Sequence, residues 1–237
     1  MDAAALTQRL VDAASRRYRS SGQFAYQFAR SKLARDPVFV AILAMGLITD
    51  HARVLDLGCG QGVLAAWLLA ADEAFAAGQW CQDWPVPPSG WHFHGLELRR
   101  QDVERANLAL GNRAKVELGD IRLRFLAQAD AIIVLDVLHY MNSDAQEVLL
   151  ARVHAALAPG GRLLLRVGDA AGGLAFQISR WLDQSVLMAR GRGWVQLHCR
   201  PVTDWVRMLE RLGFRTRAIP MSANTPFANV LLVAQLQ

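Results

Sequence analysis

The chain has few cysteines and no long apolar run. Only three of its 237 residues are cysteines, Cys59, Cys81 and Cys199, and they are widely spaced. An odd, scattered set argues against a disulfide framework and fits a reducing compartment. The longest apolar run without a charge, residues 37–49, has thirteen residues, whereas a helix needs roughly 20 to cross a bilayer. We therefore expect a core helix there.

The chain also lacks targeting and metal-binding patterns. Its first ten residues, MDAAALTQRL, show neither the basic start nor the apolar stretch of a secretory signal, so we expect a cytoplasmic location. Cys81, with His92 and His94 in an H-x-H arrangement, fits no closed zinc spacing. We predict no metal site.

Positive charge is concentrated at the N-terminus. Residues 1–35 hold seven Lys or Arg and two Asp, which accounts for the whole formal charge of +5. Such a segment is either a solvated helical face or a surface for nucleic acid, anionic lipid or an acidic partner. Only Phe24, Tyr26 and Phe28 could form a stacking platform among these arginines, so we expect no nucleic-acid partner.

From Arg53 onward, short β-like runs alternate with helical segments. The predicted strands are RVLDLG, HFHGLEL, KVELGD, DAIIVLDV and GRLLLRV, followed by a closing pair, RTRAIP and NVLLVAQ. The predicted helices cover residues 63–75, 100–110, 143–157 and 203–212, and APGG (residues 158–161) ends the third with a turn. With 53% apolar residues the chain can bury a sizeable core. This order predicts an α/β, Rossmann-like fold with a seven-stranded, mostly parallel sheet flanked by helices.

Further segments flank this pattern. Apolar residues recur at helical spacing before the first strand, at Leu6, Leu10, Val11 and Ala14 and again at Phe24, Phe28 and Leu33. We predict a helical lid segment over residues 1–50 and a main domain over residues 51–237 with a helical insertion around 170–195. The long, tryptophan- and proline-rich connection 76–90 leads from a helix to a strand, away from the ligand edge of such sheets, so we expect it to serve packing or a partner contact.

Three glycines crowd into five residues after the first predicted strand, in VLDLGCGQG (residues 54–62). We predict that the chain turns there from strand to helix, so that bare backbone and a positive helix end face a ligand. The spacing is GxGxG rather than the GxGxxG of dinucleotide folds, and Asp56 precedes the first glycine. That carboxylate would repel a pyrophosphate and attract an ammonium group.

This stretch resembles the first motif of the class I S-adenosylmethionine-dependent methyltransferases, and the resemblance extends from Arg53 to the C-terminus. GLELRR is similar to the motif whose acid holds the ribose, LGDIR to the motif beside the adenine, and LDVLHYM to the fourth-strand motif near the transferred methyl group. The resemblance implies S-adenosyl-L-methionine as the cofactor. It implies cofactor contacts from Asp56, Leu57, Gly58, Cys59, Gly60, Glu97, Leu98, Gly119, Asp120, Ile121, Asp136 and Val137.

Two of these acids have a second interpretation. By resemblance Glu97 holds the ribose hydroxyls and Asp120 the adenine amino group, whereas either residue alone could cap the helix or turn that follows it. Glu97 lies 35 residues beyond Gly62, where about 20 is usual for an acid on ribose. The tryptophan-rich connection accounts for the excess.

Methyl transfer requires an aligned acceptor, exclusion of water and, for some acceptors, a general base. His139, Tyr140 and Asp169 fall on predicted strand-end loops that face the ligand crevice. We predict these three as catalytic residues, with His139 as the base. His139 could equally be a core or cofactor-lining residue, and His198 is a further candidate.

The fourth-strand motif also bears on the acceptor. Methyltransferases of exocyclic base amines carry an Asn/Asp-Pro-Pro-aromatic turn where this chain has DVLHYM, so we expect a small aromatic or apolar acceptor. The flanks GQFAYQFARSKLARDPVF and PMSANTPFANVLL resemble bacterial methyltransferases of aryl polyene, xanthomonadin-type pigment biosynthesis. That resemblance implies a phenolic or polyene precursor, with an acidic carrier protein or a membrane surface as the partner of the basic helices. The alternative is methylation of RNA or protein through those helices.

Overall fold

The chain forms two compact units, Met1–Phe125 and Leu126–Gln237, in a computed structural model that describes residues 1–171, 197–222 and 228–236. The first unit contains α1 (Ala3–Arg16), η1 (Arg17–Ser21), α2 (Gln23–Arg35), α3 (Pro37–Ala44), β1 (Arg53–Leu57), α4 (Val63–Ala76), β2 (His92–Glu97), α5 (Arg100–Leu110), η2 (Gly111–Arg113) and β3 (Lys115–Leu118). The second contains β4 (Ala129–Leu135), η3 (Leu138–Tyr140), α6 (Ser143–Ala156), β5 (Leu157–Gly168), α8 (Val202–Arg211), β6 (Phe214–Pro220) and β7 (Asn229–Leu236).

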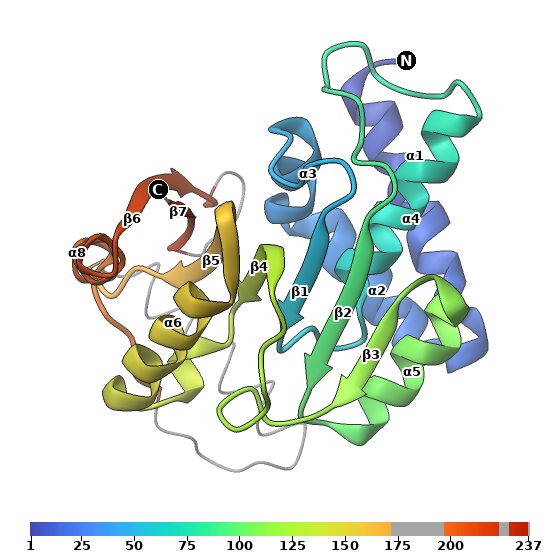
Figure 1. The fold of residues 1–237 in the computed structure, drawn as a ribbon. Helices are drawn as coiled ribbons and strands as arrows, with labels where there is room; N and C mark the ends of the chain where they lie inside the picture. Colours follow the sequence, from blue (N-terminus) through green and yellow to red (C-terminus); the bar gives the residue numbers. More distant parts are fainter. Residues whose placement is uncertain (172–196, 223–227, 237) are drawn as a thin grey trace. The chain divides into compact units, whose positions relative to one another are not determined.

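The three strands of the first unit are parallel and lie in the order β3–β2–β1 (Figure 1). Leu57 pairs with Leu96, and Glu97 pairs with Leu118, near the carboxyl ends of these strands. The segments that follow the three strands therefore leave the sheet at one edge, which is where ligands bind in such folds.

Helix α4 is the centre of the first unit. Ten of its fourteen residues are buried, because α1, α2 and α5 all pack against it. The indole Nε1 of Trp67 on α4 donates a hydrogen bond to the carbonyl of Phe39 on α3, at 2.9 Å. Asp2 caps α1 through the amide of Ala5. The N-terminal helices are thus part of this unit's core, while their role as a lid stays a prediction.

Helix α2 forms as predicted, and two alanines and one leucine make up its buried face. The side chains that are buried are Ala25, Ala29 and Leu33, whereas Phe24 is 60% exposed. Phe24 lies beside Phe28, with ring centroids 6.3 Å apart, and under the guanidinium of Arg105 on α5, at 5.0 Å. The helical spacing of Phe24 and Phe28 thus brings the two rings together, but it does not bury Phe24.

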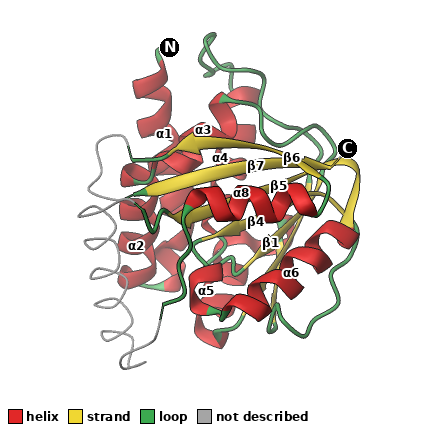
Figure 2. Cartoon of the chain, turned by 90° about the vertical axis from the view of Figure 1, so that its left-hand side faces the viewer, coloured by secondary structure: helices red, strands yellow, loops and turns green. Residues whose placement is uncertain are grey.

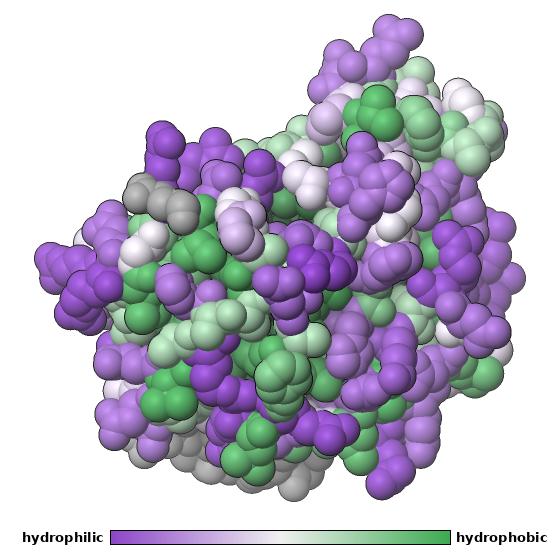
Figure 3. Space-filling view, viewed as in Figure 1, coloured by the Kyte–Doolittle hydropathy of each residue, from purple (hydrophilic) through white to green (hydrophobic). Residues whose placement is uncertain are grey.

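The tryptophan-rich connection packs on its own unit, as expected. Trp84 and Cys81 are buried, and Trp80 meets Trp84 edge to face while its Nε1 donates to the carbonyl of Pro85. The far end is held by Asp50, whose carboxylate accepts bonds from the amide and hydroxyl of Ser89. The surface over this connection, at the top of Figure 3, mixes hydrophilic and hydrophobic residues.

In the second unit β4 and β5 are parallel, and β7 is antiparallel to both β5 and β6. Helix α8 packs against β6 and β7 (Figure 2). Residues 158–161, predicted as a helix-ending turn, belong to β5 instead. Ala129 pairs with Leu157 and Ala131 with Arg162, so the extra residues bulge out of the strand.

The seven predicted strands are all present, and with their flanking helices they make the predicted Rossmann-like fold, whose sheet is mixed because of β7. The predicted insertion around 170–195 lies, from residue 172 on, outside the described residues. None of the helices in the described ranges combines the length and apolar character needed to cross a bilayer.

Candidate active site

The turn after β1 uses its glycines for two different reasons. Gly58, Gly60 and Gly62 all have left-handed backbones, with φ of 77°, 56° and 69°, which only glycine adopts without strain. A side chain at Gly62 would also strike Leu110 of α5 at 2.7 Å, whereas one at Gly60 would meet no atom within 4 Å. Gly62 therefore serves packing, and Gly60 borders open space.

The amides of this turn bond within the protein. Those of Gly58 and Cys59 donate to the carbonyl of Leu96 at 2.8 and 3.2 Å, and that of Gly60 donates to Oε2 of Glu97 at 3.0 Å. These three bonds fasten the turn to the end of β2. That the turn faces a ligand stays a prediction.

Glu97 connects the glycine turn to the next helix. Its second carboxylate oxygen accepts a bond from the amide of Arg99, the residue that precedes α5, at 2.8 Å. The side chain thus provides a local cap, as the second interpretation proposed, and also a contact 37 residues away in sequence. Neither bond excludes a ribose contact, because a carboxylate has about four acceptor positions.

Asp56 is a buried acid next to a second acid. Burial, and after it the negative charge of Glu97, raise the pKa of Asp56 to about 8. At neutral pH Asp56 is therefore mostly protonated when no cation lies beside it. A cation bound there would restore the carboxylate, because an opposite charge favours the ionised form.

Cys59 contributes more than backbone. Its sulfur lies over β2, where a side chain at Gly95 would approach it to 2.5 Å. Burial, together with the charges of Asp56 and Glu97, raises the pKa of this thiol well above its usual value. Cys59 is therefore a packing residue, not a nucleophile.

The other residues predicted to contact the cofactor in this unit differ in exposure and in their hydrogen bonds. Leu98 is 52% exposed, whereas Ile121 and Leu57 are buried. Leu57 can offer only its backbone. Asp120 accepts bonds from the amide and guanidinium of Arg122, so it caps the turn there, and this contact lowers the pKa of its carboxyl.

Gly119 follows β3 and is placed by two contacts. Its amide donates to the carbonyl of Glu97 at 2.9 Å, and a side chain there would strike that of Arg124 at 2.8 Å. The segment after β3 is thus tied directly to the end of β2.

In the second unit, Asp136 follows β4 in a left-handed conformation, with φ of 59°. Its carboxylate accepts two bonds from the guanidinium of Arg166 on β5, one of them at 2.7 Å. Arg166 is only 2% exposed. A strained non-glycine residue held by a buried arginine is typical of functional sites, and Val137, the next predicted contact, is partly exposed beside it.

His139 and Tyr140 sit together on η3, with ring centroids 4.1 Å apart. Burial lowers the pKa of His139, the charge of Asp136 opposes that change, and Arg166 adds to it. The imidazole is therefore neutral at pH 7, which is the form that can accept a proton. Tyr140 is 37% exposed.

Asp169 has a structural task that its predicted catalytic role did not include. Its Oδ1 accepts bonds from the amides of Ala171 and of Val202, the first residue of α8, at 3.0 and 3.2 Å. His198 is tied to the predicted base instead, since its amide donates to the carbonyl of His139 at 2.8 Å. In the described ranges no three His, Cys, Asp or Glu side chains group as metal ligands.

Comparison with known proteins now decides the family. Residues 22–219, most of the chain, match the family model of a methyltransferase domain. The chain belongs to this methyltransferase family. The matched range covers most of both units of the methyltransferase and includes Asp56, Glu97, Asp136 and His139.

The methyltransferase has curated relatives of two kinds. It is 29% identical over 177 residues to the tetracenomycin polyketide synthesis 8-O-methyl transferase TcmO of Streptomyces glaucescens, covering 72% of this chain and 47% of that protein. It is 31% identical over 140 residues to a carboxy-S-adenosyl-L-methionine synthase of Chromohalobacter salexigens, covering 54% of this chain and 47% of that one. The chain spans about half the length of these relatives.

Among solved structures, the methyltransferase resembles the magnesium protoporphyrin IX methyltransferase of Synechocystis PCC 6803, solved with bound SAH. The TM-score is 0.60 at 20% identity, over 93% of both chains. This likeness shows a shared fold.

Three residues of the site escaped sequence analysis. Tyr18 of η1 is fully buried and donates its hydroxyl to the carbonyl of Gln61 in the glycine turn at 2.7 Å. Arg166 had a usable signal, since a lone charge inside the apolar run LLLRV implies a buried partner. Gln146 on α6 is buried and hydrogen-bonded to the turn that carries His139, and nothing in its sequence context marks it.

Proposed function

We propose that this protein transfers a methyl group from S-adenosyl-L-methionine to a small aromatic or apolar acceptor, in the cytoplasm. The observation that carries the proposal is the pair of buried acids, Asp56 and Glu97, beside the open face of Gly60. Asp56 lies against a like charge, so a cationic ligand is favoured there. Methyltransferase family membership supports the methyl donor as that ligand.

The residues of the first unit fit this cofactor. Asp56 would hold its ammonium group, Glu97 the ribose hydroxyls, and Leu98 the adenine, with Asp120 and Ile121 near by. When bound, the cofactor supplies a methyl group already activated by its sulfonium. In the second unit, neutral His139 would accept the acceptor's proton, and exposed Tyr140 would contact the acceptor.

An aromatic hydroxyl is the acceptor that we favour. The similarity to TcmO, named for an 8-O-methyl transfer in polyketide synthesis, supports a phenolic oxygen. The flanks that resemble pigment-pathway methyltransferases support a phenolic or polyene precursor, free or attached to an acidic carrier protein.

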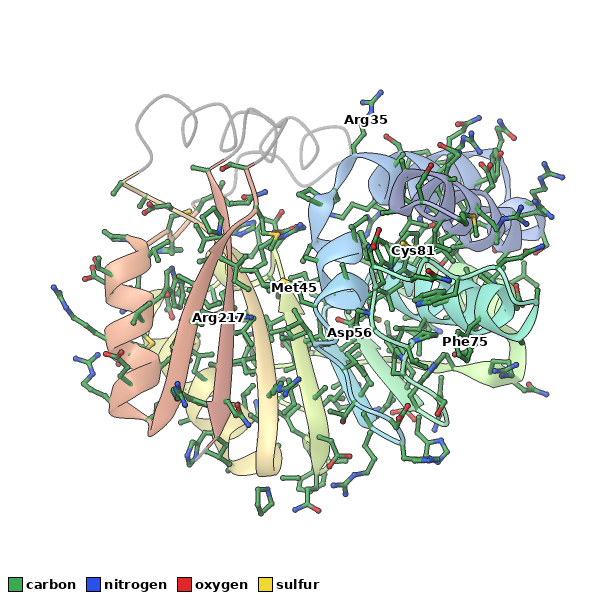
Figure 4. The ribbon with its side chains drawn as sticks, turned by 90° about the horizontal axis from the view of Figure 1, so that it is seen from above. Arg35, Met45, Asp56, Phe75, Cys81 and Arg217 are labelled. Carbon is green, nitrogen blue, oxygen red and sulfur yellow. The ribbon has the colours of Figure 1, made fainter. Side chains whose placement is uncertain are left out.

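The basic N-terminal helices give the nucleic-acid alternative little support. Arg9 donates to Gln79, Arg17 and Arg30 pair with Glu73 and Asp12, and Lys32 pairs with Asp36. Arg35, by contrast, points away from the protein at the end of α2 (Figure 4). Three of the seven cations in residues 1–35 thus pair with acids of the protein, which favours the solvated-face interpretation over RNA binding.

A second candidate follows from the other relative. Similarity to a carboxy-S-adenosyl-L-methionine synthase favours an activity that alters the cofactor itself. Mass spectrometry of the cofactor after incubation would distinguish the two, because methyl transfer yields S-adenosylhomocysteine and a heavier acceptor.

The test is transfer of a labelled methyl group from S-adenosylmethionine to phenolic and polyketide acceptors, beside total RNA and a protein extract. We expect label in the small acceptors. Transfer should be lost in Asp56→Asn and Glu97→Ala and should stay at the wild-type level in Glu104→Ala, which changes an exposed acid on α5. Label only in RNA or protein, or cofactor binding without transfer to any pool, would contradict the proposal.

A further inference from the structure

Gln146 is a fully buried amide in the first turn of α6. Its Nε2 donates toward three carbonyls, those of Leu138 and Met141 at 3.0 Å and that of His198 at 2.8 Å. Leu138 and Met141 lie on either side of His139 and Tyr140. A primary amide has two N–H bonds, so one of them is shared, and both ends of the turn are tied to one side chain.

The acceptor end of the same amide is anchored as well. Oε1 of Gln146 accepts a bond from Nε of Arg200 at 2.9 Å, and Arg200 also donates to Glu147 and to the carbonyl of Ser143. A buried polar side chain whose nitrogen and oxygen are both hydrogen-bonded is costly to replace. The amide therefore has a defined orientation.

The segment 198–202 is held against the turn from its other side. The amide of His198 donates to the carbonyl of His139, the amide of Ala170 donates to the carbonyl of Arg200, and Asp169 accepts from the amide of Val202. Gln146 lies where η3, the start of α6 and this segment meet. Moving its side chain would release both ends of the turn from α6.

We propose that Gln146 is a positioning residue for the His139–Tyr140 turn, which it holds in place through Leu138, Met141 and His198. The inference rests on the proposed function, in which His139 is the base. A base must lie within hydrogen-bond reach of the proton that it accepts, and a displacement of about 1 Å can cost about 100-fold in rate. The amide gives the turn that precision from a position that touches no reacting group.

The experiment compares Gln146→Leu and Gln146→Glu with wild type and with Val148→Ala, an exposed residue on the same helix. Gln146→Leu removes the donors, and Gln146→Glu keeps the size but turns a carboxylate toward three carbonyls. We expect kcat to fall by about 30–100-fold in both, with the cofactor Kd and the acceptor KM within threefold of wild type. Val148→Ala should match wild type.

A readout that needs no acceptor separates this inference from the proposed function. NMR titration should show His139 with a pKa below the ordinary histidine value in wild type and with a pKa nearer to it in Gln146→Leu, as water reaches the ring. If wild type transfers a methyl group to no acceptor, the proposed function is rejected. The titration would still decide the role of Gln146.

The inference is overturned if folded Gln146→Leu keeps wild-type kcat and an unchanged His139 titration, with only a lower Tm. Should Gln146→Leu fail to fold, Arg200→Ala takes its place, since it frees Oε1 and leaves the donors. We expect it to lower kcat about tenfold and to move the His139 titration in the same direction. An unchanged kcat and titration in that variant would equally overturn the inference.

Discussion

The two units each place an aspartate at the end of a buried strand, and they treat its charge in opposite ways. In the second unit Asp136 accepts two bonds from Arg166, a buried arginine on the neighbouring strand. In the first unit Asp56 is buried, and the charge that acts on it is the like charge of Glu97. The charge of Asp136 is thus balanced within its own unit, whereas an acid placed beside a second acid is suited to a cationic ligand.

The largest effect is expected from Asp56→Asn in the ligand-free protein. A folded-state pKa of about 8, against about 3.9 in an unfolded chain, means that the folded form binds more protons between these values. The free energy of unfolding of wild type should therefore fall as pH rises from 4 to 8, by roughly 3–5 kcal/mol. Asp56→Asn should remove this slope and be more stable than wild type at pH 8, as denaturant melts at several pH values would measure. A slope of the same size in the variant would contradict the assignment.

Arg166→Leu should lower the free energy of unfolding, whereas Asp56→Asn should raise it at pH 8. It leaves the carboxylate of Asp136 without its buried cation, and breaking such a pair costs about 3–5 kcal/mol. We expect about 3 kcal/mol of lost stability, because the side chain of Asp136 is 32% exposed and water can replace part of the contact. Adding Asp136→Asn should recover part of the loss, and Arg215→Leu, at an exposed position on β6, should change stability by less than about 0.5 kcal/mol. Equal stability of Arg166→Leu and wild type would remove the contrast between the units.

Glu97→Ala tests the contrast between the two units by removing the negative charge beside Asp56. Loss of a charged hydrogen bond to ribose should weaken cofactor binding by about 1–3 kcal/mol, as measured by calorimetry with S-adenosylmethionine and its demethylated product. The variant should also lower the pKa of Asp56. Because Glu97 accepts bonds from Gly60 and Arg99, its Tm must be recorded, and Glu104→Ala serves as the control. Unchanged binding by a folded variant would reject the ribose assignment.

The smallest expected effect is the number of protons released when the cofactor binds. Below pH 8 the ligand-free site holds a proton on Asp56, and the ammonium group of the cofactor should displace it. Calorimetry in buffers of different ionisation enthalpy should thus show release of up to about one proton at pH 7, and none in Asp56→Asn. Equal proton release by both proteins would place the titrating group elsewhere.

Much of the fold could be predicted because its signals are local. The helix at residues 100–110 and all seven strands follow from apolar periodicity and from the turn residues between them. Prediction failed where a local signal had two tertiary outcomes. APGG (residues 158–161) became part of a bulged β5 rather than a turn, and the apolar spacing at Phe24 left this side chain exposed under Arg105. In both cases the deciding contact lies far away in sequence.

The candidate site likewise has features that local sequence signals predict and features that depend on distant contacts. The sequence by itself determined which residues end the strands, and therefore that Asp56, Glu97 and Asp136 lie at strand ends, because strand and turn propensities act between near neighbours. Only the tertiary structure decided what each acid does, since burial, charge and hydrogen bonding depend on groups 30 or more residues away, as for Asp136 with Arg166 and Glu97 with Gly60. It also decided that Asp169 holds the start of α8 and that Gln146 holds the turn of His139, because the carbonyls and amides they bind come together only when the chain is packed.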